Sequence, residues 1–206
     1  MTSISIIGSG KMGAAIAEVA SRAGADIQIL KRSATSTSAA RPGFEYGVIG
    51  DELTGDLVVF AVPSGAYPSI LEHYRDRLGG RVVIDISNPI DFSTYDALTS
   101  PPDSSTAAEL ARALPEGASV VKAFNVNLGD TLTSGTNGTT RTTVLFAGDY
   151  ADAKTAVASL IEAAGMRAVD VGPLTRAREL EAMGFLQIIM AALGKTRYES
   201  GFTLLE

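Results

Sequence analysis

The sequence predicts a doubly wound α/β fold, in which a mostly parallel sheet carries helices on both faces. Three observations lead to this fold class: short apolar runs alternate with helix-length segments, the runs are continuously apolar, and a glycine-rich turn follows the first of them. The 206 residues, 46% of them hydrophobic and 19% charged, have the length and balance of one globular domain. We therefore expect residues 1–206 to form a single domain with a C-terminal helical extension over about 173–206.

The predicted strands are apolar runs without polar alternation, as expected for strands that are buried on both faces. They cover residues 4–8, 27–30, 57–62, 82–87, 120–124, 144–147 and 168–171. The predicted helices cover residues 14–22, 67–78, 107–114, 151–164 and 174–193. Polar stretches rich in Gly, Pro and Ser predict loops at 33–43, 93–105 and 129–143.

Several helix ends have their own signals. Thr106 and Glu109 form a capping-box pair, Asp149 can cap the helix that follows it, and Gly165 can end that helix. The last predicted helix is apolar around much of its circumference, so we expect burial on more than one side. Burial inside the monomer and packing in a homodimer both explain this composition.

Composition excludes several classes of function. A net charge of −6 and a pI near 4.9 argue against a nucleic-acid partner. Without cysteine and with His73 as the single histidine, the chain is not expected to hold a metal, and we interpret His73 as a structural residue of a surface helix. There is neither an apolar run of membrane-spanning length nor an export signal, so we expect no membrane partner and a cytoplasmic protein.

A glycine motif follows the first predicted strand and opens the first predicted helix. In a dinucleotide-binding (Rossmann) turn, the first glycine permits the tight turn, the second lets a pyrophosphate approach the backbone, and the third lets the helix pack on the strand. The free N–H groups of the helix N-terminus then bind the phosphates. The candidate residues are Gly8, Ser9, Gly10, Lys11, Met12 and Gly13.

The end of the second predicted strand indicates which dinucleotide is bound. An NAD site usually has an Asp or Glu there for the ribose 2′-hydroxyl, whereas this chain has Lys31, Arg32 and Ser33. Two cations and a hydroxyl suit a 2′-phosphate, so we predict NADP(H). The alternative is an ordinary solvated basic turn.

Polar and backbone-shaping residues follow three further strands, at 62–65, 87–89 and 125–127. The carboxyl ends of strands in an open α/β sheet line the ligand crevice, so these segments should converge on the nicotinamide, although each could also be a structural turn. The sequence shows no triad or paired carboxylates, and we predict no side-chain acid or base catalyst. The chemistry would then belong to bound cofactors, as in direct hydride transfer between two stacked rings.

The chain resembles the F420-dependent NADP oxidoreductases, which use the deazaflavin coenzyme F420, and the related cytoplasmic domain of membrane ferric reductases. The resemblance covers nearly the whole length. It is carried by the glycine turn, by Lys31-Arg32-Ser33, by GPLTRARELE at residues 172–181 and by VVKAFN at residues 120–125. It implies an NADP site, a second planar ring on the nicotinamide, and nicotinamide contacts at Val62, Pro63, Asn88, Pro89 and Asn125.

The chain departs from the deazaflavin reductases beside the expected hydride site. Those proteins have a histidine-containing segment where this chain has residues 124–126, and a different segment at 87–89. NADP(H) binding therefore transfers from the family more directly than the electron partner does. An acidic deazaflavin tail could be received by Arg141, Arg176, Arg178 or Arg197, each of which could equally be a solvated surface charge.

The sequence is compatible with three functions. The first is an enzyme that moves a hydride between NADP(H) and coenzyme F420. The second is an NADPH-dependent reductase of another small-molecule redox acceptor, such as a free flavin, a ferric chelate or a small carbonyl compound. The third is a noncatalytic NADPH-binding sensor.

Overall fold

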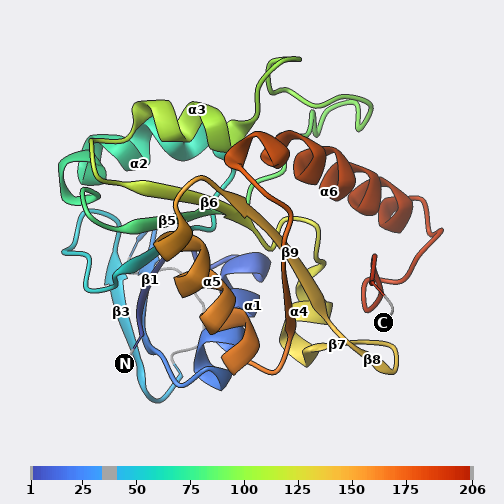
Figure 1. Ribbon diagram of the computed structural model, residues 1–206, viewed down its shortest axis with the longest axis horizontal. Coiled ribbons are helices and arrows are strands. Elements are labelled where there is room, and N and C mark those ends of the chain that lie inside the picture. Colours follow the sequence, from blue (N-terminus) through green and yellow to red (C-terminus); the bar gives the residue numbers. More distant parts are fainter. Residues whose placement is uncertain (1, 34–40, 205–206) are drawn as a thin grey trace.

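In the computed structural model, which describes residues 2–33 and 41–204, an eight-stranded sheet runs through the centre of the molecule (Figure 1). The strand order is β10-β9-β6-β5-β4-β1-β2-β3. The strands are β1 Ser3–Ile7, β2 Asp26–Lys31, β3 Phe44–Val48, β4 Leu57–Phe60, β5 Val82–Asp85, β6 Ser119–Ala123, β9 Thr143–Gly148 and β10 Arg167–Asp170. A separate short hairpin consists of β7 Thr136–Asn137 and β8 Thr140–Arg141.

The sheet has one change of strand direction and one switch point. Strands β3, β2, β1, β4, β5 and β6 are parallel, β9 pairs antiparallel with β6, and β10 is parallel to β9. β1 lies between β2 and β4, so the chain order reverses beside the first strand, where ligands bind in open α/β sheets. The predicted mostly parallel, doubly wound α/β class is confirmed.

Helices cover both faces of the sheet (Figure 1). Helices α1 Lys11–Arg22, α4 Gly129–Ser134 and α5 Ala151–Ala163 pack on one face, and α2 Tyr67–Tyr74 and α3 Thr106–Ala113 pack on the other. Along β1, Ile4 and Ile6 belong to the first core and Ile7 to the second. This alternation explains why the strands are apolar throughout.

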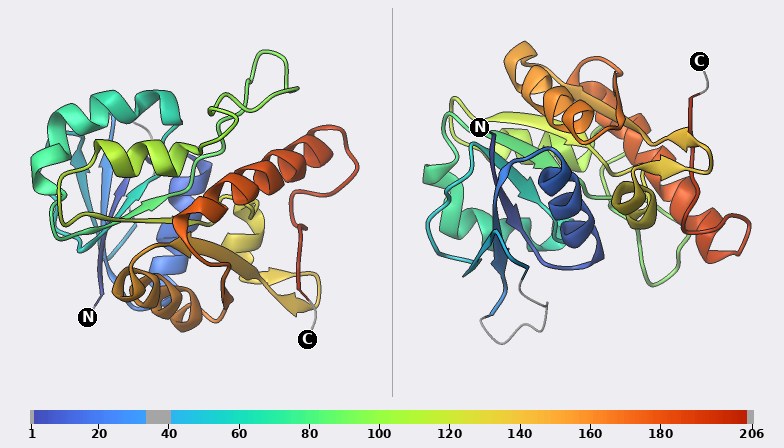
Figure 2. Two further views of the ribbon diagram at one scale, coloured as in Figure 1. Left: turned by 45° about the horizontal axis from the view of Figure 1, so that its top comes forward. Right: turned by 90° about the horizontal axis from the view of Figure 1, so that it is seen from below.

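Helix α6, Ala177–Ala192, follows a 3₁₀ turn over Leu174–Arg176 and extends past the sheet. The segment 91–100 projects from the body beside it (Figure 2). Other 3₁₀ turns lie at Ser64–Ala66 and Arg75–Arg77. In the part of the chain that the structure describes, no helix is long and apolar enough to cross a membrane.

The seven predicted strands are confirmed, with ends that differ by one or two residues. Strand β3 was not predicted, because its five residues include Glu45 and Gly47 and its strand is only partly buried at the sheet edge. The prediction of a loop over 129–143 is wrong in detail, since α4 and the β7–β8 hairpin lie there. Of the predicted loop at 33–43, residues 34–40 lie outside the described residues.

Two predicted helix caps are wrong. The N-cap of α3 is Ser105, whose Oγ accepts from the N–H of Ala108 at 3.1 Å, so Thr106 is already helical. The N-cap of α5 is Tyr150, and Asp149 instead accepts a hydrogen bond from the N–H of Leu174 at 2.8 Å. Asp149 thereby fixes the start of the path into α6. Gly165 does end α5, with a positive φ of 80°.

Candidate dinucleotide site

The glycine turn between β1 and α1 has a geometry that only glycine permits at two of its three positions. Gly8 has φ +116°, and a Cβ there would lie 2.3 Å from the carbonyl oxygen of Ala61. A Cβ on Gly13 would lie 2.2 Å from the carbonyl oxygen of Gly8. The Gly8 N–H donates to the carbonyl of Leu30 at 2.9 Å, which ties the turn to β2. These contacts are the tight turn and the close helix–strand packing that the motif predicts.

Gly10 differs from its two neighbours because it faces open space. A Cβ at this position would meet no atom within 4 Å. Gly10 is also the N-cap of α1, and no side chain caps that helix end. An open approach to uncapped N–H groups at a helix N-terminus is the arrangement that binds a pyrophosphate.

A cavity of about 480 Å³ lies between the glycine turn and the end of β2. Arg32 and Ser33 line it together with Gly8, Ser9, Gly10, Ile49, Ala61, Val62 and Pro63. Arg32 and Ser33 are exposed, so a guanidinium and a hydroxyl face the space beside the glycine turn. This placement fits a ribose 2′-phosphate.

Lys31, the other predicted cation of this turn, lies elsewhere. It is the last residue of β2 and only 8% exposed, and its Nζ lies 4.5 Å from the centre of the Tyr46 ring on β3. The side chain therefore packs on an aromatic face and is not among the residues that line the cavity. Lys31 still belongs to β2 and packs beside β3, whereas Arg32 follows the end of the strand, which explains the difference.

A second cavity of about 500 Å³ continues from the glycine turn along the ends of β4 and β5. Gly10, Ala61, Val62 and Pro63 border both cavities. The second cavity is also lined by Lys11, Met12, Ser64, Gly65, Ile86, Ser87, Asn88, Pro89, Ile90, Phe92, Thr99 and Ile188. The predicted nicotinamide residues Val62, Pro63, Asn88 and Pro89 are thus brought together, and Phe92 of the projecting segment and Ile188 of α6 line the same cavity.

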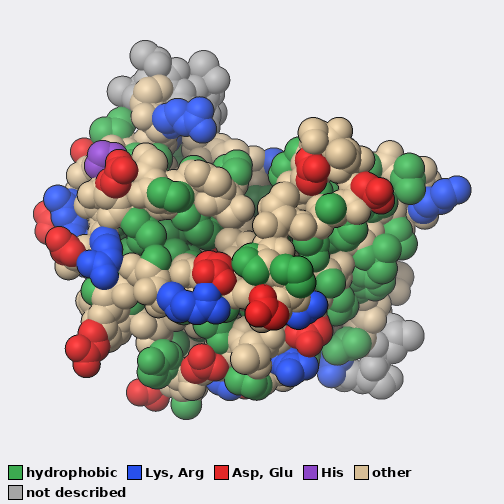
Figure 3. All heavy atoms as spheres, turned by 90° about the horizontal axis from the view of Figure 1, so that it is seen from above, with side chains coloured by type: hydrophobic (Ala, Val, Ile, Leu, Met, Phe, Trp, Pro, Cys, Tyr) green, Lys and Arg blue, Asp and Glu red, His purple; other side chains and the backbone are tan. Residues whose placement is uncertain are grey.

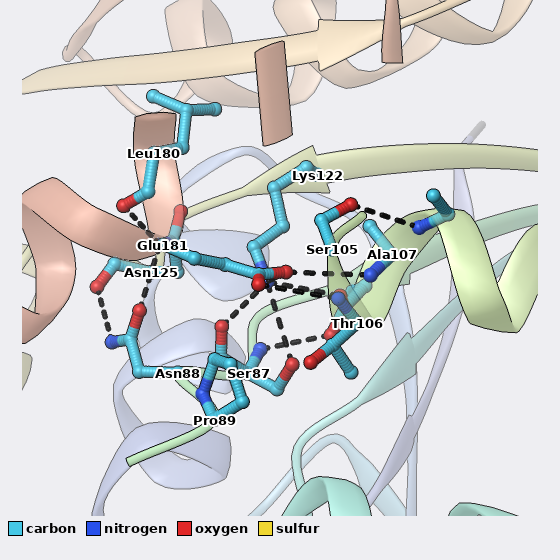
Figure 4. Close-up of polar contacts among 12 residues, drawn as sticks. Ser87, Asn88, Pro89, Ser105, Thr106, Ala107, Lys122, Asn125, Leu180 and Glu181 are labelled. Carbon is cyan, nitrogen blue, oxygen red and sulfur yellow. Dashed lines mark hydrogen bonds and ion pairs between the residues drawn. The ribbon is translucent and has the colours of Figure 1, made fainter. Parts of the chain in front are cut away.

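Asn125 is not among the residues that line this cavity. It is 3% exposed, and its Nδ2 donates to Asn88 Oδ1 and to the Leu180 carbonyl, both at 2.8 Å (Figure 4). Asn88 Nδ2 in turn donates to the Asn125 carbonyl at 2.8 Å. Asn125 therefore fixes the orientation of the Asn88 side chain without lining the cavity itself. The preceding residue, Phe124, has φ 62°, which is unusual for a bulky residue.

Sequence reasoning missed a buried ionic cluster beneath this cavity. Lys122 contacts the carboxylates of Asp85 and Glu181, and the hydroxyl of Tyr67 donates to Asp85. Burial raises the pKa of Glu181 above its usual value, and the Lys122 ammonium opposes that rise. Burial, with the Asp85 charge adding to it, holds the pKa of Tyr67 well above its usual value. A lysine and an aspartate inside apolar strands were the available signal, because such charges need partners.

The remaining predicted candidates lie away from both cavities. His73 is an exposed residue of α2, and Arg141, Arg176, Arg178 and Arg197 are exposed residues that line neither cavity. Arg176 pairs with Glu179 at 3.0 Å. Within residues 2–33 and 41–204, no group of His, Asp and Glu side chains is arranged to hold a metal ion.

An open sheet whose first turn leaves room for a pyrophosphate is the architecture of Rossmann-type dinucleotide-binding proteins. A family model described as "NADP oxidoreductase coenzyme F420-dependent" matches residues 3–89, from β1 to the Asn88-Pro89 turn. The F420-dependent NADP reductase of Methanocaldococcus jannaschii is 30% identical over 150 residues, which cover 68% of this chain and 66% of that protein. The chain belongs to this family of NADP(H)-dependent oxidoreductases.

Two further similar proteins extend the comparison over most of the chain. Metalloreductase STEAP3 of Rattus norvegicus is 29% identical over 181 residues, or 87% of this chain, but this chain spans only 36% of that protein. The crystal structure of a putative F420-dependent NADP reductase from Arthrobacter sp. superimposes with a TM-score of 0.83 at 25% identity. That match covers 98% of this chain and 99% of the Arthrobacter chain, so the C-terminal helix belongs to the shared fold.

Proposed function

We propose that this protein transfers a hydride between NADP(H) and a planar redox acceptor, coenzyme F420 in the first place. The observation that carries the proposal is the continuity of the two cavities along Gly10, Val62 and Pro63. The first cavity suits the 2′-phosphate and pyrophosphate half of the dinucleotide. The second suits the nicotinamide with a further ring beside it.

The dinucleotide supplies the hydride chemistry when it is bound, and the chain's residues position it. Gly10 and the α1 N-terminus receive the pyrophosphate, and Arg32 and Ser33 receive the 2′-phosphate. Pro63, Asn88 and Pro89 form the wall against which the nicotinamide lies. Phe92, which is 58% exposed, and Ile188 line the same cavity and supply apolar surface beside the ring.

Coenzyme F420 is the preferred acceptor because the family and the reductase of M. jannaschii carry it in their names. Another acceptor has one structural argument in its favour. Among the described residues, Lys11 is the single Lys or Arg that lines the second cavity, so an acidic coenzyme tail would have to lie outside it. A free flavin, a ferric chelate or a small carbonyl compound needs no such tail site, and the metalloreductase relative points to the chelate.

An anaerobic assay of NADPH oxidation separates these acceptors. The purified protein is mixed with NADPH and, in parallel, with coenzyme F420, riboflavin, ferric citrate and a small aldehyde. Turnover with F420 well above turnover with the other three supports the proposal. If only riboflavin, ferric citrate or the aldehyde supports turnover, that compound and not F420 is the acceptor. NADPH binding without turnover in any reaction favours a noncatalytic sensor.

A further inference from the structure

The buried cluster beneath the second cavity joins three elements that are distant in sequence. Lys122 on β6 lies 2.9 Å from Asp85 Oδ2 on β5 and 3.1 Å from Glu181 Oε1 on α6, and none of the three side chains is more than 1% exposed. Figure 4 shows the Lys122 ammonium between the α6 carboxylate and the loop that carries Ser87. Replacing one member of such a buried group would leave charges without partners.

The two carboxylates of the cluster are fully engaged by protein donors. Glu181 accepts from the N–H groups of Thr106 at 3.1 Å and Ala107 at 3.3 Å, at the N-terminus of α3. Asp85 Oδ1 accepts from the Tyr67 hydroxyl and from the Ser87 N–H, the latter at 2.9 Å. The positive end of the α3 dipole compensates the second negative charge. These contacts hold the two carboxylates and Lys122 in place, so the cluster can in turn orient the main-chain groups to which it bonds.

The cluster holds the main chain of Ser87 from both sides. The Ser87 N–H donates to Asp85, and the Ser87 carbonyl accepts a hydrogen bond from Lys122 Nζ. Ser87 is followed by Asn88 and Pro89, and all three line the second cavity. The main-chain direction of this wall is thus determined by a lysine that lines neither cavity.

We propose that Lys122 is a positioning residue for the nicotinamide: by holding the Ser87 carbonyl, it orients the Asn88-Pro89 wall against which the ring lies. The inference rests on the proposed NADP(H) site. It predicts that Lys122 contributes to affinity for the nicotinamide half of the cofactor and leaves the adenosine half unaffected.

The test compares two ligands on each protein variant. NADPH occupies both cavities, whereas 2′-phospho-ADP-ribose carries the groups for the glycine turn and Arg32 but lacks the nicotinamide. Lys122→Met should weaken NADPH binding about tenfold, the loss expected when contacts worth one hydrogen bond are misaligned. Its dissociation constant for 2′-phospho-ADP-ribose should stay within about twofold of the unmodified value.

Three further variants separate positioning from general loosening of the core. Lys122→Met/Glu181→Gln removes one charge of each sign, so it is the variant to measure if the single substitution does not fold. Glu181→Gln keeps the Lys122–Ser87 contact and should leave the ratio of the two affinities unchanged. Gln28→Met removes a buried polar group that bonds Ser5 and Glu52 away from the cavities, and it should also leave the ratio unchanged.

Each outcome decides. The quantity compared is the affinity for NADPH divided by the affinity for 2′-phospho-ADP-ribose. A fall of this ratio in the two Lys122 variants alone supports the inference, and an equal fall in Gln28→Met overturns it. An unchanged ratio in the Lys122 variants, or failure of both to fold, also rejects a specific positioning role. If the unmodified protein binds 2′-phospho-ADP-ribose as tightly as NADPH, the nicotinamide is not held in the second cavity. If it binds neither ligand, the NADP(H) site itself is wrong.

Discussion

Gly184 on α6 lies so close to Asn88 that a Cβ at Gly184 would be 2.3 Å from Asn88 Oδ1 and 2.8 Å from the Asn125 carbonyl. The backbone of α6 therefore contacts the side chain of Asn88, which lines the second cavity. This approach requires a glycine in the middle of a helix, where glycine otherwise costs about 1 kcal/mol relative to alanine.

An alanine at position 184 would disrupt this contact. Gly184→Ala should displace Asn88 and weaken NADPH binding, with a loss of about 1–3 kcal/mol in the free energy of unfolding from overpacking. Titration calorimetry and denaturant unfolding measure the two effects. Gly79→Ala is the matched control, because its Cβ would meet its nearest atom at an ordinary 3.5 Å. Unchanged NADPH affinity in Gly184→Ala would contradict the role given to Asn88.

The cofactor preference should depend on Arg32. Arg32→Asp replaces a cation with an anion beside the expected 2′-phosphate, and a charge-assisted hydrogen bond is worth about 1.5–3 kcal/mol, so NADPH affinity should fall more than about tenfold. NADH affinity should change little, which narrows or inverts the preference. Arg178→Asp makes the same charge change at an exposed site on α6 and should have no effect. Equal NADH and NADPH affinities in the unmodified protein would disprove the assignment.

The glycine turn gives a prediction with two opposite outcomes. Gly10→Val should abolish NADPH binding while the protein stays folded, because the new side chain points into open space that the pyrophosphate needs. Gly13→Val should destabilise the fold itself, since even its Cβ would clash with the Gly8 carbonyl. Thermal unfolding and NADPH titration of both variants check this. Normal binding by Gly10→Val would reduce the motif to a structural turn.

Stability should depend on pH through Glu181. Burial raises its pKa in the folded chain above the usual value near 4.5, so at intermediate pH the folded state binds more protons than the unfolded state. The stability contributed by this group is therefore gained as pH falls toward 4.5 and lost as pH rises through the folded pKa.

Glu181→Gln removes this titration. The free energy of unfolding of the unmodified protein, minus that of Glu181→Gln, should increase as pH is lowered from 7 toward 4.5 in urea titrations. Asp91, Glu109 and Asp170, whose pKa values are lowered, act in the opposite direction but are common to both proteins and cancel. A difference that is independent of pH would show that Glu181 does not titrate in this range.

The apolar surface of α6 leads us to propose a homodimer. Leu186 and Leu193 are 51% and 67% exposed, and hydrophobic side chains gather over the C-terminal half of α6 in Figure 3. Sedimentation equilibrium at micromolar concentration should give a dimer, and Leu186→Glu should dissociate it without unfolding. Tyr150→Glu, at an exposed residue that caps α5, is the control. A monomeric mass for the unmodified protein refutes the dimer.

The sequence predicted what depends on local pattern. The strands were recognisable because they are buried on both faces, and the glycine turn because its conformation and close contacts exclude side chains at Gly8 and Gly13. The positions of Arg32 and Ser33 beside the first cavity, and of the residues at the ends of β4 and β5 beside the second, are those expected at the carboxyl ends of parallel strands. Strand β3 was not predicted because a partly buried edge strand has neither a continuous apolar run nor a clear alternation of apolar and polar residues.

What could not be predicted depends on contacts between distant segments. Lys122 meets partners 37 and 59 residues away, and no spacing rule links them. Asn125 was expected beside the nicotinamide, but the positive φ of Phe124 turns the chain so that its amide faces Asn88 and α6. Lys31 and Arg32 are adjacent cations, but Arg32 lines the first cavity and Lys31 does not. The difference depends on where β2 ends, which the sequence does not give to the residue.

The second cavity is lined by residues from both ends of the chain. Gly10 follows the first strand, whereas Ile188 lies on α6, which comes after β9 and β10 in the chain. During synthesis the glycine turn is therefore made first, the Asn88-Pro89 wall later, and Ile188 last. A nascent chain without α6 has the glycine turn, Arg32 and the Asn88-Pro89 wall but lacks Ile188, so the second cavity is complete only after the helix α6 has been synthesised.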